Sequence, residues 1–191
     1  MEKIQSIELV IKDEDDGVFA ISLVESPAIE ENFVALSKEE VEFKAIDDER
    51  RIVVGFALVP DKEIPRKQNG KEFNIYFSKD TVAKSAELYM KNLNLANVTS
   101  EHDKPVKDCC VIESWIVEDA KNDKSNLFNL GAKGGEWVVM MKLYNDEEYQ
   151  KAKSGEYKGF SIEALYDGFE QLNSKQPTEE EIIEQLKDLL K

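Results

Sequence analysis

A nearly unbroken apolar run at residues 51–59 constrains the fold of this chain more than any other segment. Its sequence is Arg-Ile-Val-Val-Gly-Phe-Ala-Leu-Val, which is rich in β-forming residues and does not alternate with polar ones. Such a pattern predicts a strand that is buried on both faces near the centre of a sheet. Pro60 ends the strand, because proline has no N–H group to donate to a neighbouring strand. The chain must therefore cover both sides of this strand.

Further segments have strand patterns, and two have the end signals of helices. A helix over 79–92 is predicted to begin at the N-cap Ser78, and a short one follows Asn145, has Glu148 as a capping-box partner and ends at Gly155. We expect residues 4–12 and 18–24 to pair as a hairpin, and 65–71 to be a polar loop with an Asn-Gly turn. The other expected strands are 72–77, 97–100, 109–117, 137–144 and 158–166.

The C-terminal tail differs in composition from the rest of the chain. Residues 173–177 read as a linker, and Thr178 begins a capping-box pattern for an amphipathic helix over 178–191. The apolar stripe of that helix is Ile182, Ile183, Leu186, Leu189 and Leu190. We therefore expect one domain over 1–172 and a detachable helix that mediates association. It would dock on its own domain, on a second copy in a homo-oligomer, or on a partner protein.

Composition excludes several classes of function. The 191 residues, 41% of them hydrophobic, suffice for one packed domain. The net charge of −15 argues against binding nucleic acid or an anionic membrane, both of which require a basic surface. Cys109 and Cys110 are the only cysteines and are adjacent, which predicts free thiols in a reducing, cytoplasmic compartment rather than a disulfide or zinc site. One histidine and two adjacent cysteines make no standard set of metal ligands, and no phosphate-binding loop occurs, so we expect no metal, nucleotide or other cofactor.

The only histidine is His102, in Glu101-His102-Asp103, and a candidate nucleophile is Ser161, in the run Gly-Phe-Ser-Ile-Glu. If imidazole performs acid–base chemistry near neutral pH in this chain, His102 must be the residue. A serine needs such a base to act as a nucleophile. Ser161 and Glu163 are two residues apart and point to the same side of a strand.

The two short motifs, 101–103 and 159–163, resemble those of phage prohead maturation proteases, and most closely the branch called putative phage serine protease XkdF. The opening segments Asp-Gly-Val-Phe-Ala-Ile-Ser-Leu-Val (16–24) and Ser-Pro-Ala-Ile-Glu-Glu-Asn-Phe (26–33) are similar as well. The resemblance extends to about residue 172. It implies an α+β fold with a mostly antiparallel, barrel-like sheet ringed by helices, as in the related herpesvirus assemblins.

The resemblance also implies a function. Members of the family are serine endopeptidases that act inside the immature capsid, in the host cytoplasm, on the scaffold protein, the major capsid protein and usually themselves. Ser161 matches the nucleophile and His102 the general base. Assemblins use a second histidine as third member, which this chain lacks, so that role falls to Asp103, to Glu163 or to no residue. Glycine-containing segments 131–135 and 155–159 are candidates for oxyanion-stabilising backbone donors. The alternative is a non-enzymatic scaffolding or interaction protein that retains the protease fold.

Overall fold

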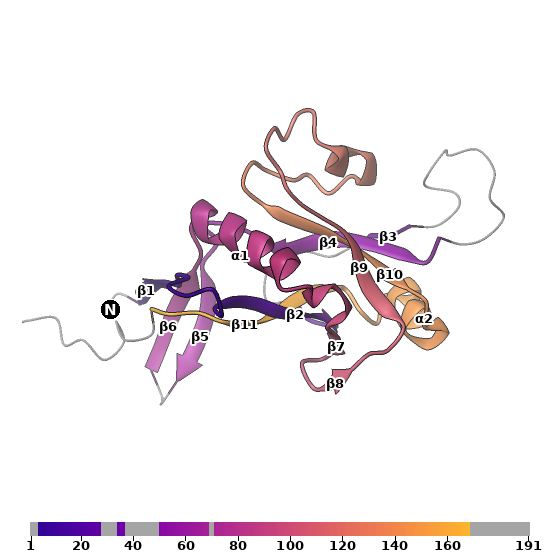
Figure 1. Ribbon diagram of the computed structural model, residues 1–191, viewed down its shortest axis with the longest axis horizontal. Helices are drawn as coiled ribbons and strands as arrows, with labels where there is room; N and C mark the ends of the chain where they lie inside the picture. The colour runs from indigo at the N-terminus through magenta and orange to yellow at the C-terminus, as the bar shows by residue number, and fades with distance from the viewer. Residues whose placement is uncertain (1–3, 28–33, 37–49, 69–70, 169–191) are drawn as a thin grey trace, which may run out of the picture.

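The computed structural model describes residues 4–27, 34–36, 50–68 and 71–168. It contains two α-helices and three sheets (Figure 1). The strands are β1 (Gln5–Glu8), β2 (Gly17–Val24), β3 (Val34–Leu36), β4 (Ile52–Leu58), β5 (Ile64–Gln68), β6 (Lys71–Tyr76), β7 (Val98–Ser100), β8 (Lys104–Pro105), β9 (Cys109–Ile116), β10 (Trp137–Leu143) and β11 (Gly159–Leu165). The helices are α1 (Lys79–Lys91) and α2 (Asp146–Ser154), and 3₁₀ turns occupy Asn94–Ala96 and Lys124–Phe128.

The strands are ordered β1-β6-β5, β3-β4-β10-β9 and β11-β2-β7-β8 in the three sheets. Only the pairs β1–β6 and β2–β7 are parallel among the described strand pairs. The α+β class and the mostly antiparallel pairing are thus confirmed. The described strands form no closed barrel, so the barrel-like, assemblin-like arrangement stays a prediction.

The apolar run that we placed at the centre of a sheet is β4, which lies between β3 and β10. Every residue of β4 is buried. Val53 and Ala57 pack into the larger hydrophobic cluster, whereas Val54 and Phe56 pack into a second cluster on the opposite side. The prediction of a strand buried on both faces is therefore confirmed. Both faces are buried because β4 lies between two hydrophobic clusters.

Helix α1 begins and packs as its sequence predicts. The Ser78 hydroxyl accepts a hydrogen bond from the Thr81 N–H, which satisfies one of the free donors of the first turn. The helix lies along β2 (Figure 1), and Val82 and Tyr89 join the same core as the strand's Ile21. One face of the β11-β2-β7-β8 sheet is therefore covered by α1.

Helix α2 also has the predicted ends, but one detail differs. The Asn145 side chain accepts from the N–H groups of Glu147 and Glu148, and Gly155 ends the helix at a φ of 79°. The Glu148 carboxylate does not close a capping box. It accepts a hydrogen bond from the Tyr157 hydroxyl at 2.7 Å and lies 3.3 Å from Lys151 Nζ. The bond to Tyr157 is favoured over a capping box because it gives the buried Tyr157 hydroxyl a hydrogen-bond partner.

Two expectations about the first half of the chain are wrong. Residues 4–12 and 18–24 do not form a hairpin: β1 pairs in parallel with β6, and β2 pairs with β11 and β7. The residues expected as a polar loop include most of β5, which pairs antiparallel with β6 on either side of residues 69–70. Pro65 is tolerated there because β5 is at the edge of its sheet. The predicted linker and C-terminal helix lie outside the described residues.

The two free cysteines differ in burial, which leads to a testable difference in reactivity. Cys109 is buried and Cys110 is partly exposed. Burial raises the pKa of the Cys109 thiol to about 11, so almost none of it is thiolate at pH 8. We expect iodoacetamide at pH 8 to alkylate Cys110 at least ~10-fold faster than Cys109, as measured by peptide mass mapping. The Cys110→Ser variant should resist alkylation until urea unfolds it; equal rates at both thiols in the folded protein would contradict this difference.

Candidate active site

Three strands bring a row of hydroxyl side chains onto one face of the β11-β2-β7-β8 sheet. Ser161 on β11 is paired with Ser22 on β2, and Ser22 is paired with Thr99 on β7. Residues directly opposite each other in neighbouring strands point to the same face. The residues beside them in sequence, including Phe160 and Ile21, point into the main core. The row therefore lies on the face turned away from that core.

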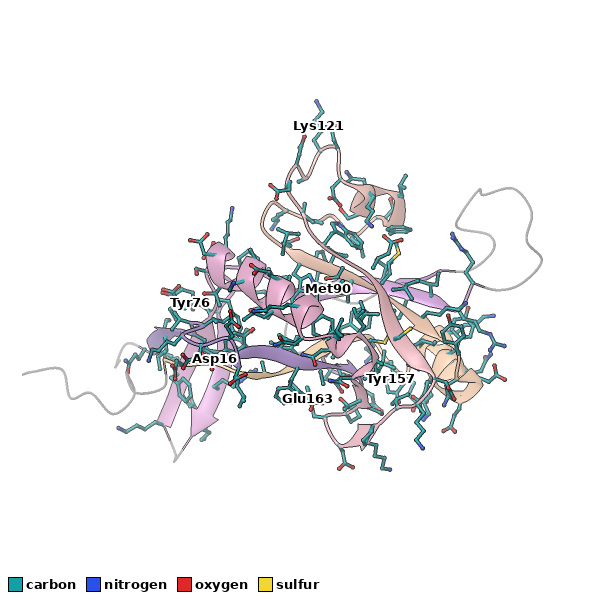
Figure 2. All side chains as sticks on the ribbon, viewed as in Figure 1. Asp16, Tyr76, Met90, Lys121, Tyr157 and Glu163 are labelled. Carbon is teal, nitrogen blue, oxygen red and sulfur yellow. The ribbon has the colours of Figure 1, made fainter. Side chains whose placement is uncertain are left out.

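Glu163 extends this face by one strand repeat beyond Ser161. It is paired with Ala20 on β2, and its carboxylate reaches across β2 to β7. There Glu163 Oε1 accepts a hydrogen bond from the Thr99 hydroxyl. The side chain is 21% exposed. Figure 2 shows Glu163 on the side of β2 that faces away from α1.

His102 lies in the short connection between β7 and β8, above the same face. Both Glu101 and His102 have left-handed backbone conformations, with φ of 50° and 57°. Two consecutive non-glycine residues in this region are unusual and persist only when neighbouring contacts hold them. Here the Glu101 N–H donates to the Leu23 carbonyl at 3.1 Å, and the His102 N–H donates to the Ser22 hydroxyl at 3.0 Å. β2 thus fixes the position of the histidine.

The imidazole of His102 meets the carboxylate of Glu163. Their Nδ1 and Oε1 atoms are 3.5 Å apart, and the imidazole is 42% exposed. A carboxylate at Nδ1 favours the tautomer that keeps the proton there, which leaves Nε2 as the proton acceptor. This is the division of labour that a general base requires. The Asp103 side chain, by contrast, is exposed, and only its backbone N–H takes part in the turn, by donating to the Ser100 carbonyl.

A buried hydrogen-bond chain holds the end of β7 from the core side. The Tyr157 hydroxyl lies 2.7 Å from the Ser100 hydroxyl and donates to Glu148 on α2 at 2.7 Å. Because the phenol donates its only proton to Glu148, Ser100 is the donor in the other bond. Burial raises the pKa of the Tyr157 phenol, which keeps it protonated. Ser100 immediately precedes the turn that contains His102, so these two hydrogen bonds anchor the turn to α2.

We expect Tyr157→Phe to lower the free energy of unfolding by about 1–3 kcal/mol, because the Glu148 carboxylate loses a buried donor. Urea denaturation measures this change. Tyr144→Phe is the matched control, since Tyr144 is 59% exposed and should change stability by less than about 0.5 kcal/mol. Equal stability of the Tyr157→Phe variant and the wild type would show that the hydrogen bonds of the Tyr157 hydroxyl contribute nothing to the free energy of unfolding.

Two of the glycines considered as oxyanion donors have other tasks. The Gly135 N–H donates to the Val117 carbonyl at 2.8 Å, and the Gly155 N–H donates to the Ala152 carbonyl at 3.2 Å. These glycines therefore serve a turn and a helix end, and their N–H groups are not free to bind an oxyanion.

The structure brings together some of the residues predicted from sequence and separates others. His102 and Glu163 are in contact, and Ser161 shares their face of the sheet. Asp103 does not join them. The sequence interpretation assigned no role to Ser22. The available sequence signal is a hydroxyl residue that interrupts the apolar run of β2, and the structure shows that Ser22 is fully buried. Within the described ranges, no group of three or more His, Cys, Asp and Glu side chains is placed to hold a metal ion.

None of the helices in the part of the chain that the structure describes is long and apolar enough to cross a membrane. In a comparison with protein families, the family described as "Putative phage serine protease XkdF" matches residues 39–170. The matched range contains His102, Ser161 and Glu163 and leaves out the opening segments 16–24 and 26–33. No curated protein and no solved structure matches the chain.

Proposed function

The chain belongs to the phage serine protease family described by the name XkdF, and from this membership we propose that it is a serine endopeptidase of prohead maturation. Its substrates in this proposal are the scaffold protein, the major capsid protein and the chain itself, inside the immature capsid in the host cytoplasm. The observation that supports it best is the contact of the His102 Nδ1 with Glu163 on the face that carries Ser161.

In the proposed mechanism, His102 Nε2 accepts the proton of the Ser161 hydroxyl while Oγ attacks a peptide carbonyl. The carbon–nitrogen bond then breaks, the proton passes from His102 to the leaving amine, and an acyl-enzyme remains. Water, deprotonated by the same imidazole, hydrolyses this ester and regenerates the serine. The approach of the imidazole to Ser161 is part of the proposal, because resting sites often tighten only when substrate binds.

We assign the third position to Glu163 rather than to Asp103. The Glu163 carboxylate lies at Nδ1 and is itself oriented by the Thr99 hydroxyl, so it can hold the ring and stabilise the imidazolium. The exposed Asp103 side chain has no comparable position. We also propose, from the resemblance to assemblins, that the three sheets close in a barrel-like arrangement around this site.

The test of this function is incubation of the chain with the capsid and scaffold proteins of the same phage, followed by intact mass measurement. Wild type should convert a substrate into two fragments whose masses sum to that of the substrate plus one water. Ser161→Ala should leave the substrate whole. Identical fragments from both proteins would refute the mechanism, and intact substrate with both would favour the non-enzymatic interaction protein considered above.

We propose further that the predicted C-terminal helix, residues 178–191, serves association and not chemistry. Truncation after Asn173 is expected to leave cleavage of a peptide within about twofold of the full chain, because both motif segments precede the cut. Light scattering should report a smaller particle if the helix joins copies of the chain. Loss of peptide cleavage or of cooperative unfolding would place the helix in the catalytic domain instead.

A further inference from the structure

A pocket opens beside Ser161 where the three sheets meet. Its volume is ≈ 170 Å³, roughly ten times the ~15 Å³ that one water needs and similar to the ~150 Å³ cavity known to accept benzene. Ser161 and Ile162, which point to opposite faces of β11, both line it. Because β11 is the outermost described strand of its sheet, the pocket borders the edge of that strand. The nucleophile of the proposed reaction is thus part of the pocket wall.

Most of the remaining wall is apolar, and neighbouring side chains hold part of it in place. It includes Leu9, Ala57, Leu58, Ile64, Phe77 and Tyr166. The Tyr166 ring packs against Phe77 with centroids 4.9 Å apart, and its hydroxyl lies 2.7 Å from the Ser85 hydroxyl. The phenolic group therefore already has a partner, and the ring offers carbon surface to the pocket.

One charged side chain occurs in this lining, and it is a cation. Arg66 on β5 contributes to the pocket, and its guanidinium donates to the Pro65 carbonyl at 2.9 Å. No carboxylate belongs to the described lining residues. A lysine or arginine side chain entering the pocket would lose water, gain no counter-charge and meet the positive charge of Arg66.

We propose that this pocket receives a large apolar side chain of the substrate, namely that of the residue whose carbonyl Ser161 attacks. The side chain and the attacked carbonyl of one residue share a Cα, so a pocket that includes the nucleophile is within reach of that side chain. Burial of the extra apolar surface of a leucine or phenylalanine side chain should give a preference of roughly 10- to 100-fold over alanine. This inference rests on the proposed serine protease function and adds its substrate class.

The experiment uses serine-directed peptidyl diphenyl phosphonates that differ only in the side chain nearest phosphorus: Phe, Leu, Ala or Lys. Ser161 Oγ forms a bond to phosphorus, phenoxide leaves, and the proton is taken up by His102, so that intact mass reports the rate of labelling. We expect the Phe and Leu probes to label wild type at least ~10-fold faster than the Ala probe, with the Lys probe slowest.

Variants of the pocket lining and a matched control show whether the pocket itself determines the order of labelling rates. Ala164→Leu adds volume to the pocket lining and should bring the Phe and Leu probes to within about threefold of the Ala probe. Ala120→Leu is the matched control, because Ala120 is also partly buried but packs against the second cluster away from the pocket, and it should keep the wild-type order. Arg66→Gln should raise the relative rate of the Lys probe several-fold. Thermal unfolding confirms that each variant is folded.

The outcomes distinguish this inference from the function on which it rests. Labelling of Ser161 at similar rates by all four probes, or fastest labelling by the Lys probe, would overturn the apolar pocket and leave the protease intact. Failure of every probe, together with failure of a small ethyl fluorophosphonate, would overturn both. The same order of rates in Ala164→Leu as in wild type would assign the preference to a different surface.

Discussion

Replacing Ser161 or His102 by alanine is expected to lower kcat/KM for the capsid substrate by about 10⁴- to 10⁶-fold. In the proposed mechanism, Ser161→Ala removes the atom that would form the acyl-enzyme, and His102→Ala removes the only imidazole of the sequence, which would take its proton. The double variant should be little worse than either single one, because the two residues act as a unit. Single-turnover cleavage followed by mass spectrometry measures all three rates.

Both substitutions should leave the fold intact. Within the described structure, the Ser161 hydroxyl has no hydrogen-bond partner to lose, and the backbone N–H that ties His102 to Ser22 remains in the alanine variant. Ser154→Ala, at an exposed serine of α2, is the control and should cleave like wild type. A Ser161→Ala protein that retains more than about 1% of the wild-type rate would rule out Ser161 as the nucleophile.

Glu163→Gln is expected to lower kcat by about 10²- to 10⁴-fold with little change in KM. The amide has the same shape and can still accept from Thr99, but it lacks the charge that, in the proposed mechanism, stabilises the imidazolium and favours the required tautomer. The expected loss is therefore in proton transfer and not in substrate binding. Steady-state kinetics with a peptide substrate separate kcat from KM.

Asp103→Asn is the matched control for Glu163→Gln, since both remove one carboxylate charge near His102. The Asp103 side chain is exposed, and the ion pair of His102 is with Glu163, so the Asp103 variant should stay within about threefold of wild type. A large loss in Asp103→Asn combined with a small loss in Glu163→Gln would reverse the assignment. Equal, small losses in both would leave a pair of Ser161 and His102 without a third member.

Elements with local signals were predicted well from the sequence. Ser78 and Asn145 mark the starts of α1 and α2, because their side chains accept hydrogen bonds from free N–H groups of the first turn. Gly155 marks the end of α2. The buried strand β4 follows from its composition alone. Strand partners were predicted poorly, because β1 and β2 find theirs far along the chain, where core burial outweighs the short connection that suggested a hairpin.

The candidate site shows the same division. The residue types pointed to His102 and Ser161, and strand periodicity put Glu163 on the side of Ser161. The choice between Glu163 and Asp103 required the register of three strands, which sets the 3.5 Å separation of Nδ1 and Oε1. The contacts of Ser22 and Tyr157 connect segments 57 to 80 residues apart, and no local pattern encodes such distances.

The central claim is that His102 activates Ser161 as a nucleophile, and reaction with a fluorophosphonate tests it most directly. Wild type should gain the mass of one phosphonyl group, and peptide mapping should place that group on Ser161. The His102→Ala variant should react at least ~10³-fold more slowly, and Ser161→Ala should not react at all. Labelling of wild type at another residue, or no labelling of the folded wild type, would contradict the account.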